Sequence, residues 1–176
     1  MLVDIEIDAE ELEKVSAGLN LLPGAVDRAA RRAVSRTATW ARSQAARAAS
    51  RELEVGYTKI RNRIRIYRQS DGSVKIWAGS RPLPAWAFGK PVQRQKGVRA
   101  GKKFFRGAFV IKKYAKPGKA HAYYRVGRER FPIRKARVDI ADEMSAIMNT
   151  VQSNVFSKLK ERLSHELDYE LSKVKM

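Results

Sequence analysis

Apolar residues recur at steps of three or four in two long segments of the chain. The first runs from about Pro23 to Leu53, where the repeating positions are mostly alanines and Pro23 suits the first position of a helix. The second begins near Asp139, and its apolar positions are Met144, Met148, Val151, Val155, Leu159, Leu163, Leu167 and Leu171. This spacing is that of one face of an α-helix, so both segments are predicted to be long helices.

Strand-like patterns fill the middle of the chain. Short apolar and aromatic runs are bounded there by Gly, Pro and basic clusters, which is typical of strands joined by turns. Asp71-Gly72 is a good hairpin turn, and Pro132 favours an edge strand or a strand start. The predicted strands are Leu2–Ile7, Ile64–Tyr67, Val74–Trp77, Phe104–Tyr114, His121–Val126 and Phe131–Val138.

Together these elements predict an α+β fold. We expect an antiparallel β-sheet of about five to six strands, flanked by a long N-terminal Ala/Arg helix and a long C-terminal helix. Short helices are expected at Ala9–Leu19 and Gly56–Arg63. The predicted division is an α+β core domain over residues 1–143 and a long C-terminal helix over residues 144–176.

The C-terminal helix is long for a domain of this size. About 30 residues at about 1.5 Å each give a rod of about 45 Å. We therefore expect Leu163, Leu167 and Leu171, in its distal half, to pack on a neighbouring subunit. The alternative is an amphipathic helix that folds wholly onto its own domain.

Positive charge is concentrated in the middle of the chain. The formal net charge is +19, yet residues 1–27 carry seven acids and one Lys. Residues 81–138 carry eighteen Lys and Arg and one acid, Glu129, which is a net charge of +17. A middle this basic calls for a polyanion or an acidic protein surface nearby. Nucleic acid and the acidic ends of a neighbouring copy both remain open as partners.

Residues 91–103 have many Gly and basic residues and few large apolar ones. They are predicted to form an exposed, mobile loop. Phosphate contacts need charge and reach but no fixed geometry, so this loop is the candidate contact to nucleic acid or to an acidic partner. A surface loop that only keeps the protein soluble is the alternative. The candidate residues are Arg94, Lys96, Arg99, Lys102 and Lys103.

A second basic feature lies on the first long helix. Arg28, Arg32 and Arg36 follow one another at a spacing of four and so share one face. That face is interpreted either as solvated or as a contact to DNA phosphate or an acidic neighbour. Trp40 on the same helix is predicted to be a core residue and not a stacking platform.

No pattern in the chain indicates catalysis. The absence of cysteine excludes disulfides, thiolate metal sites and a Cys nucleophile. His121 and His165 stand in no metal-ligand spacing, and the basic middle lacks the convergent carboxylates that acid–base catalysis or a hard metal requires. No phosphate-binding glycine loop is present. We therefore expect no enzyme activity, no catalytic or metal-binding residue and no cofactor.

Membrane and sequence-specific DNA-binding signals are absent as well. No apolar run reaches about 18 residues, and the N-terminus is acidic, unlike a secretory signal. Neither a helix-turn-helix nor a zinc-finger pattern is evident. Aromatic residues do interleave with basic ones, as in single-strand binders, although in alternating strands they commonly fill the core. These aromatic residues are Phe104, Phe105, Tyr114, Tyr123 and Tyr124.

Two segments together resemble the phage minor tail protein Z family, also called tail completion proteins. The first is RTATWARSQAARAASRELEV followed by YTKIRNRIRIYR. The second is an ordered series that leads into the C-terminal helix: WAFG at 86–89, KGV at 96–98, RGAFV at 106–110, YYRVG at 123–127 and RFPI at 130–133. The resemblance covers roughly residues 22–150.

The resemblance implies a virion structural protein that acts late, when the tail is completed and joined to the head. It carries over no catalytic residues. The positions it marks as holding the fold are Trp40, Phe88, Gly89, Gly107, Ala108, Phe109, Pro132 and Ile133. Gly107 is expected to allow a bend or a close backbone approach, and Phe109 to anchor the central strand.

Residue pattern and resemblance together predict a homo-oligomeric ring, such as a hexamer, at the head-proximal end of a tail. Its expected partners are other tail or neck proteins and non-specifically bound DNA, with no membrane. The expected location is the virion tail or neck of a phage, prophage or tail-like particle, assembled in the bacterial host cytoplasm. The alternative is a free-standing, sequence-independent nucleic-acid-binding protein.

Overall fold

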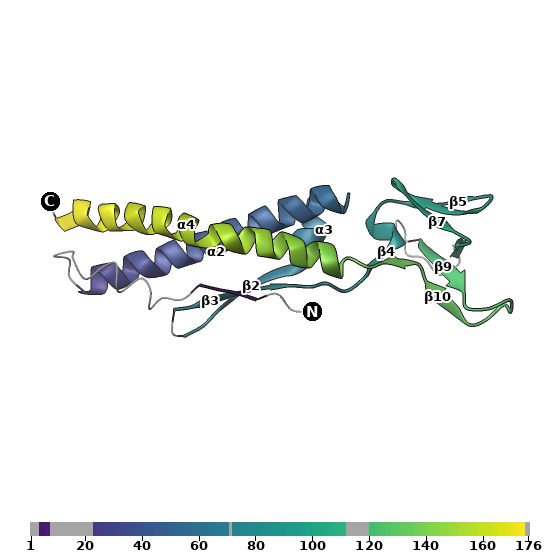
Figure 1. Ribbon diagram of the computed structural model, residues 1–176, viewed down its shortest axis with the longest axis horizontal. Helices are drawn as coiled ribbons and strands as arrows, with labels where there is room; N and C mark the ends of the chain where they lie inside the picture. Colours follow the sequence, from purple (N-terminus) through teal and green to yellow (C-terminus); the bar gives the residue numbers. More distant parts are fainter. Residues whose placement is uncertain (1–3, 8–22, 71, 112–119, 175–176) are drawn as a thin grey trace. The chain divides into compact units, whose positions relative to one another are not determined.

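The computed structural model describes residues 4–7, 23–70, 72–111 and 120–174 (Figure 1). Contacts divide the chain into two compact units. The first consists of Met1–Ala48, Arg61–Gly79 and Ser145–Met176, and the second of Ala49–Ile60 and Ser80–Met144. Both long helices contribute residues to both units.

The two predicted long helices are confirmed. Helix α2 spans Pro23–Glu52 and helix α4 spans Ala141–Val174, while the short helix α3 spans Tyr57–Arg61. An Asp139 carboxylate oxygen accepts a hydrogen bond from the Ala141 backbone N–H at 3.0 Å, and acids occupy the first turn of α4. Negative charge there suits the positive end of the helix dipole. The helix expected at 9–19 lies outside the described residues.

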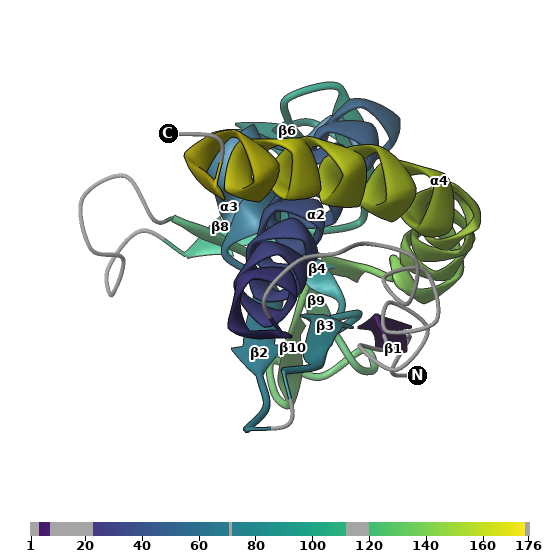
Figure 2. The same cartoon turned by 90° about the vertical axis from the view of Figure 1, so that its left-hand side faces the viewer.

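The first unit contains a three-stranded antiparallel sheet in the order β1-β3-β2. Its strands are β1 (Asp4–Ile7), β2 (Ile64–Arg68) and β3 (Val74–Ala78), so the predicted hairpin is confirmed. The sheet lies beside α2 in both views (Figures 1 and 2). The Arg68 guanidinium in β2 donates to the Ser35 hydroxyl in α2 at 3.1 Å.

Small residues on α2 and large ones on α4 form the helical core of this unit. Ala29, Ala33, Ala38 and Ala45 are fully buried on α2. The buried apolar side chains of α4 in this unit are Met148, Val151, Val155, Leu159, Leu163 and Leu167. Burying each such side chain stabilises the fold by about 1.5–3 kcal/mol.

The second unit is built from short strands and one 3-10 turn, η1 (Ala85–Ala87). Three of its strands form an antiparallel sheet in the order β5-β6-β7, three form another in the order β10-β9-β8, and β11 pairs with β4. The strands are β4 (Leu83–Pro84), β5 (Pro91–Arg94), β6 (Gly97–Ala100), β7 (Lys103–Arg106), β8 (Phe109–Ile111), β9 (His121–Arg125), β10 (Ile133–Lys135) and β11 (Arg137–Val138).

The α+β class is confirmed, and the described strands form four small antiparallel sheets in place of one larger sheet. The prediction of a mobile loop at 91–103 is wrong, because this segment forms β5, β6 and the start of β7. The alternation of buried and exposed positions in this segment is hard to recognise in the sequence, because the inward-facing residues between the long basic ones are small, such as Ala100. The strand predicted from Phe104 divides at Gly107, whose positive φ of 73° provides a bend with open space around it. Tyr114 lies outside the described residues.

The backbones at two glycines of the second unit, Gly89 and Gly101, lie in close contact. A Cβ on Gly89 would lie 2.7 Å from the Gly101 backbone nitrogen, and a Cβ on Gly101 would lie 2.3 Å from the Phe88 carbonyl oxygen. Gly101 also has a positive φ of 58°. The turn before β5 therefore packs against the β6–β7 turn at a distance that excludes any side chain.

Replacement of Gly101 by alanine is expected to lower the free energy of unfolding by about 2 kcal/mol or more, because strain and a backbone clash add. Thermal or urea unfolding followed by circular dichroism measures the change. The matched control is Gly127→Ala, since no atom lies within 4 Å of its added Cβ. Equal stability of the two variants would contradict the close approach.

Candidate polyanion-contact surface

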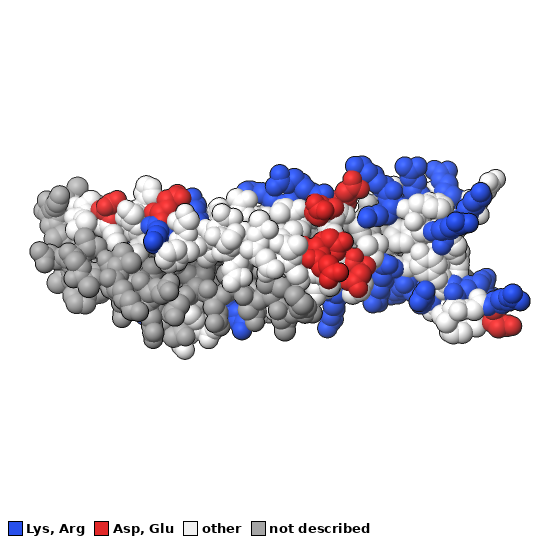
Figure 3. Space-filling view, viewed as in Figure 1, with Lys and Arg blue, Asp and Glu red and all other residues white. Residues whose placement is uncertain are grey.

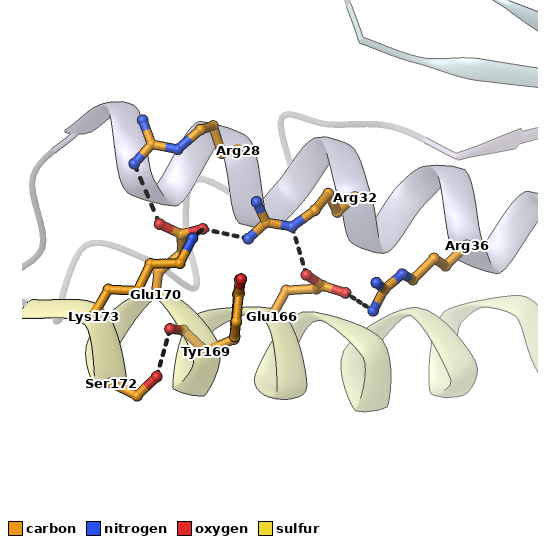
Figure 4. A network of polar contacts seen from close by, with 8 residues as sticks. All are labelled: Arg28, Arg32, Arg36, Glu166, Tyr169, Glu170, Ser172 and Lys173. Carbon is orange, nitrogen blue, oxygen red and sulfur yellow. Dashed lines mark hydrogen bonds and ion pairs between the residues drawn. The ribbon is translucent and has the colours of Figure 1, made fainter.

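The arginine face of α2 is turned toward α4 of the same chain (Figure 4). An Arg28 Nη2 donates to Glu170 at 3.2 Å, and Arg32 Nε donates to Glu166 at 2.6 Å. Arg32 also binds Glu170, and Arg36 completes the row by binding Glu166. Spacings of four on both helices thus bring three guanidinium groups onto two carboxylates.

Burial in this network is unequal. The side chains of Glu166 and Glu170 are 3% and 2% exposed, whereas Arg28 and Arg36 are about 60% exposed. Charged carboxylates are tolerated at such depth only when they are paired and hydrogen-bonded. The acidic partner of the arginine face is therefore an element of the same chain, and Arg32 bridges both carboxylates.

One pKa in the network is strongly displaced. The hydrogen bond from Arg32 lowers the pKa of Glu170 from 4.5 to about 2, against the effect of burial, which would raise it. Arg28 and Lys173 add smaller contributions in the same direction. The Tyr169 ring completes the cluster, with the Lys173 ammonium 4.1 Å and the Arg32 guanidinium 5.4 Å from its centroid. The Ser172 hydroxyl donates to the Tyr169 carbonyl oxygen (Figure 4).

The β5-β6-β7 sheet presents a different basic surface. Successive side chains of a strand point to opposite faces, so the register places Arg94, Gly97 and Arg106 in one cross-strand row. Val92, Arg99 and Phe104 form the next row on the same face. All of these except Gly97 are exposed, whereas the opposite face contains buried Val98, Ala100 and Phe105. We call the six residues Val92, Arg94, Gly97, Arg99, Phe104 and Arg106 the arginine sheet face.

The five candidate residues predicted for nucleic-acid or acidic-partner contact are all exposed, but they do not lie together. Arg94 and Arg99 lie on the arginine sheet face, and Lys96 lies in the β5–β6 turn. Lys102 forms an ion pair with Glu54 at 2.6 Å. Lys103 lies on the opposite face, 5.8 Å from the centroid of the Phe88 ring.

Arg106 was not among the predicted contact residues. Arg106 begins the RGAFV motif, and only the strand register brings it beside Gly97 and Arg94. An alternation signal through 97–106 could have found it, because Val98, Ala100 and Phe105 mark the buried positions. Lys and Arg side chains gather over this sheet in Figure 3, and acids lie over the start of α4.

Aromatic rings line part of the second unit. The Trp86 ring packs edge-on against the His121 ring, with 6.5 Å between their centroids. The His121 ring packs in the same way against Tyr123, with 6.2 Å between centroids. The ring centroids of Tyr123 and Phe109 are 6.3 Å apart, and the Arg125 guanidinium lies 5.1 Å from the centroid of the Phe109 ring. These rings are half-buried, so they pack on one another along β8 and β9 while keeping partial exposure. His121 is thus part of an aromatic row.

The positions marked by the family resemblance have varied environments. Phe88 and Ala108 are buried, while Trp40, Phe109 and Ile133 are half-buried and Pro132 is exposed after a cis peptide bond. Of the residues predicted to contact a neighbouring subunit, Leu163 and Leu167 are buried within this chain and Leu171 is half-buried. A subunit contact through α4 would therefore need other side chains.

Within the described ranges, no group of three or more His, Cys, Asp or Glu side chains is arranged to hold a metal ion. None of the described helices combines the length and the apolarity that crossing a membrane requires.

Replacing Glu166 by glutamine should lower the free energy of unfolding by about 1–3 kcal/mol, because two guanidinium groups lose their charged acceptor. The control is Glu161→Gln on the same helix, whose exposed carboxylate forms an ion pair with Lys158 three residues away. We expect no measurable change there. Urea unfolding measures both, and equal losses would contradict a special role for the buried pair.

Acid should weaken the helix pair in a defined range of pH. A carboxyl group whose pKa is lowered on folding stabilises the fold fully above about pH 4.5, and this contribution is lost as the pH falls toward about 2. Glu170→Gln should therefore flatten the dependence of the melting temperature on pH in this range. Melting curves between pH 2 and 7 test this, with exposed Asp168→Asn as the control. If the melting temperature of Glu170→Gln falls with acid as steeply as that of the wild type, Glu170 is not the group responsible.

Comparison with known proteins agrees with the motif series. The sequence matches the family described as prophage minor tail protein Z (GPZ) over residues 10–175. This range extends beyond residues 22–150, which the motif resemblance covered. No curated protein and no solved structure matches the chain. Since the family match spans far more than half of the sequence, the chain belongs to the prophage minor tail protein Z family.

Proposed function

We propose that the chain completes a phage tail at its head-proximal end and helps to join tail and head, as one subunit of a homo-oligomeric ring around the DNA passage. The observation that carries this proposal is the family match over residues 10–175, which makes the chain a phage tail protein. The ring, the neck position and assembly in the host cytoplasm are the finer parts of the proposal. Its partners would be further copies of the chain and other tail or neck proteins.

Exposed aromatic residues on α4 support a structural subunit. Phe156 is 51% exposed and Tyr169 is 53% exposed, although the apolar row of the same helix is buried. Lys160 lies 4.5 Å from the centroid of the Phe156 ring. Aromatic residues are enriched where protein surfaces meet, so the surface of α4 around Phe156 is suited to contact with a neighbouring copy. The Tyr169 ring lies on another side of the helix, beside Arg32 of α2.

The charge distribution supports a DNA passage. Residues 81–138 have a net charge of +17, and the arginine sheet face is exposed. Contacts between arginine and backbone phosphates are independent of sequence and weaken with salt. Such contacts would let DNA pass through a ring without being held at one position.

A free-standing nucleic-acid-binding protein remains the second candidate, favoured by the same face and by the half-buried aromatic row. Light scattering of the purified chain separates the two. A multiple of the 19.9 kDa chain mass supports the ring. A monomer at high concentration that binds DNA tightly near physiological salt supports the alternative.

Electron microscopy of particles that carry a labelled copy of the chain should show the label at the head-proximal end of the tail. Particles produced without the chain should accumulate tails that remain separate from heads. Label confined to the distal tip, or absent from particles, would contradict the proposal.

A further inference from the structure

Two arginines flank a glycine on the arginine sheet face. Arg94 and Arg106 stand on the outer strands of the sheet, and Gly97 lies between them on β6. Gly97 is buried, and a Cβ added to it would lie 2.2 Å from the Phe105 carbonyl oxygen, so no side chain fits between the two arginines. Neighbouring strands lie about 5 Å apart, so the two arginine Cα atoms are about 10 Å apart. Two long guanidinium side chains at this separation can converge over the glycine on one small anion or reach two adjacent ones.

The charges of these two side chains are not neutralised by the described part of the chain. The α2 arginines bind Glu166 and Glu170, and Lys102 binds Glu54. Arg94 and Arg106 have no such ion pair among the described residues, and residues 91–106 contain no acid. An external anion is therefore the natural counter-charge for this row.

Hydrogen bonds hold the backbone beneath these two arginines. The Gln93 side-chain amide donates to the carbonyl oxygens of Arg94 and Gly97, both at 3.0 Å, and its oxygen accepts from the Val110 N–H at 2.9 Å. The Gly107 N–H donates to the Lys96 carbonyl oxygen at 2.9 Å. These bonds tie β5 and the β5–β6 turn to Gly107 and to Val110 in β8, which lowers the entropic cost of binding a ligand at the row.

We propose that the Arg94–Gly97–Arg106 row, with Arg99 beside it, binds backbone phosphates of duplex DNA. Arginine forms bidentate hydrogen bonds with phosphate oxygens, and protein–DNA interfaces are far more positive than protein–protein ones. A protein partner fits less well, because the cores of protein interfaces are depleted of charge and this face has only Val92 and Phe104 as apolar members. The proposal rests on the proposed function, and it specifies which surface meets the DNA.

The test is titration of a fluorescent random-sequence duplex with the full chain at several salt concentrations. The double variant R94Q/R106Q should weaken binding at low salt about tenfold or more. It should also reduce the slope of log affinity against log salt by about 2, one phosphate contact for each arginine. The control R47Q/K160Q removes the same charge from exposed helix positions and should leave the slope nearly unchanged. Circular dichroism verifies that both variants are folded.

Equal weakening in both double variants would overturn the proposal, since net charge alone would then explain binding. A preference for single strands that F104A abolishes would also overturn it, because stacking would then be the main contact. The results also distinguish failure of the DNA site from failure of the proposed tail function. If R94Q/R106Q loses duplex affinity as expected but the chain is missing from particles, the DNA site stands and the tail role fails. If the chain enters particles and R94Q/R106Q binds duplex like the wild type, the site fails alone.

Discussion

Two buried carboxylates constrain how the long helices pair. Glu166 and Glu170 lie in the interface between α2 and α4, where an unpaired charge would be too costly to keep. They are stable there because Arg28, Arg32 and Arg36 lie opposite at the matching spacing. A shift of one helix by one turn would leave a guanidinium or a carboxylate without its partner. The ion pairs thus specify the register of an interface that apolar packing holds together.

Both helices also bury apolar side chains. The alanines of α2 and the large apolar row of α4 are buried, and the long arginine side chains of α2 reach the carboxylates of α4. The side chains of Arg28 and Arg36 remain largely exposed, so these arginines keep much of their hydration while they pair with the buried carboxylates. In this unit, positive charge therefore serves the fold.

In the second unit, positive charge has a different status. Alternation along β5, β6 and β7 puts apolar residues on one face and arginines on the other, and the described chain provides no acid opposite that face. The close contact of Gly89 with Gly101 and the hydrogen bonds of Gln93 hold this small sheet in shape. A sheet with unneutralised arginines is suited to a negatively charged partner, which is the basis for proposing DNA as its ligand.

The sequence by itself determined the elements whose signals are local. Helical periodicity defined α2 and α4, and Asp71-Gly72 between two apolar runs predicted the β2–β3 hairpin. It also determined the family, through motifs such as RGAFV and RFPI. It could not determine which of many arginines are neutralised, because Arg32 and Glu166 are 134 positions apart and meet only when α2 packs on α4. Nor could it place Arg106 beside Arg94, since that neighbourhood depends on strand register. Pairing across a fold is a property of tertiary structure, because it depends on distances in space that the order of residues does not contain.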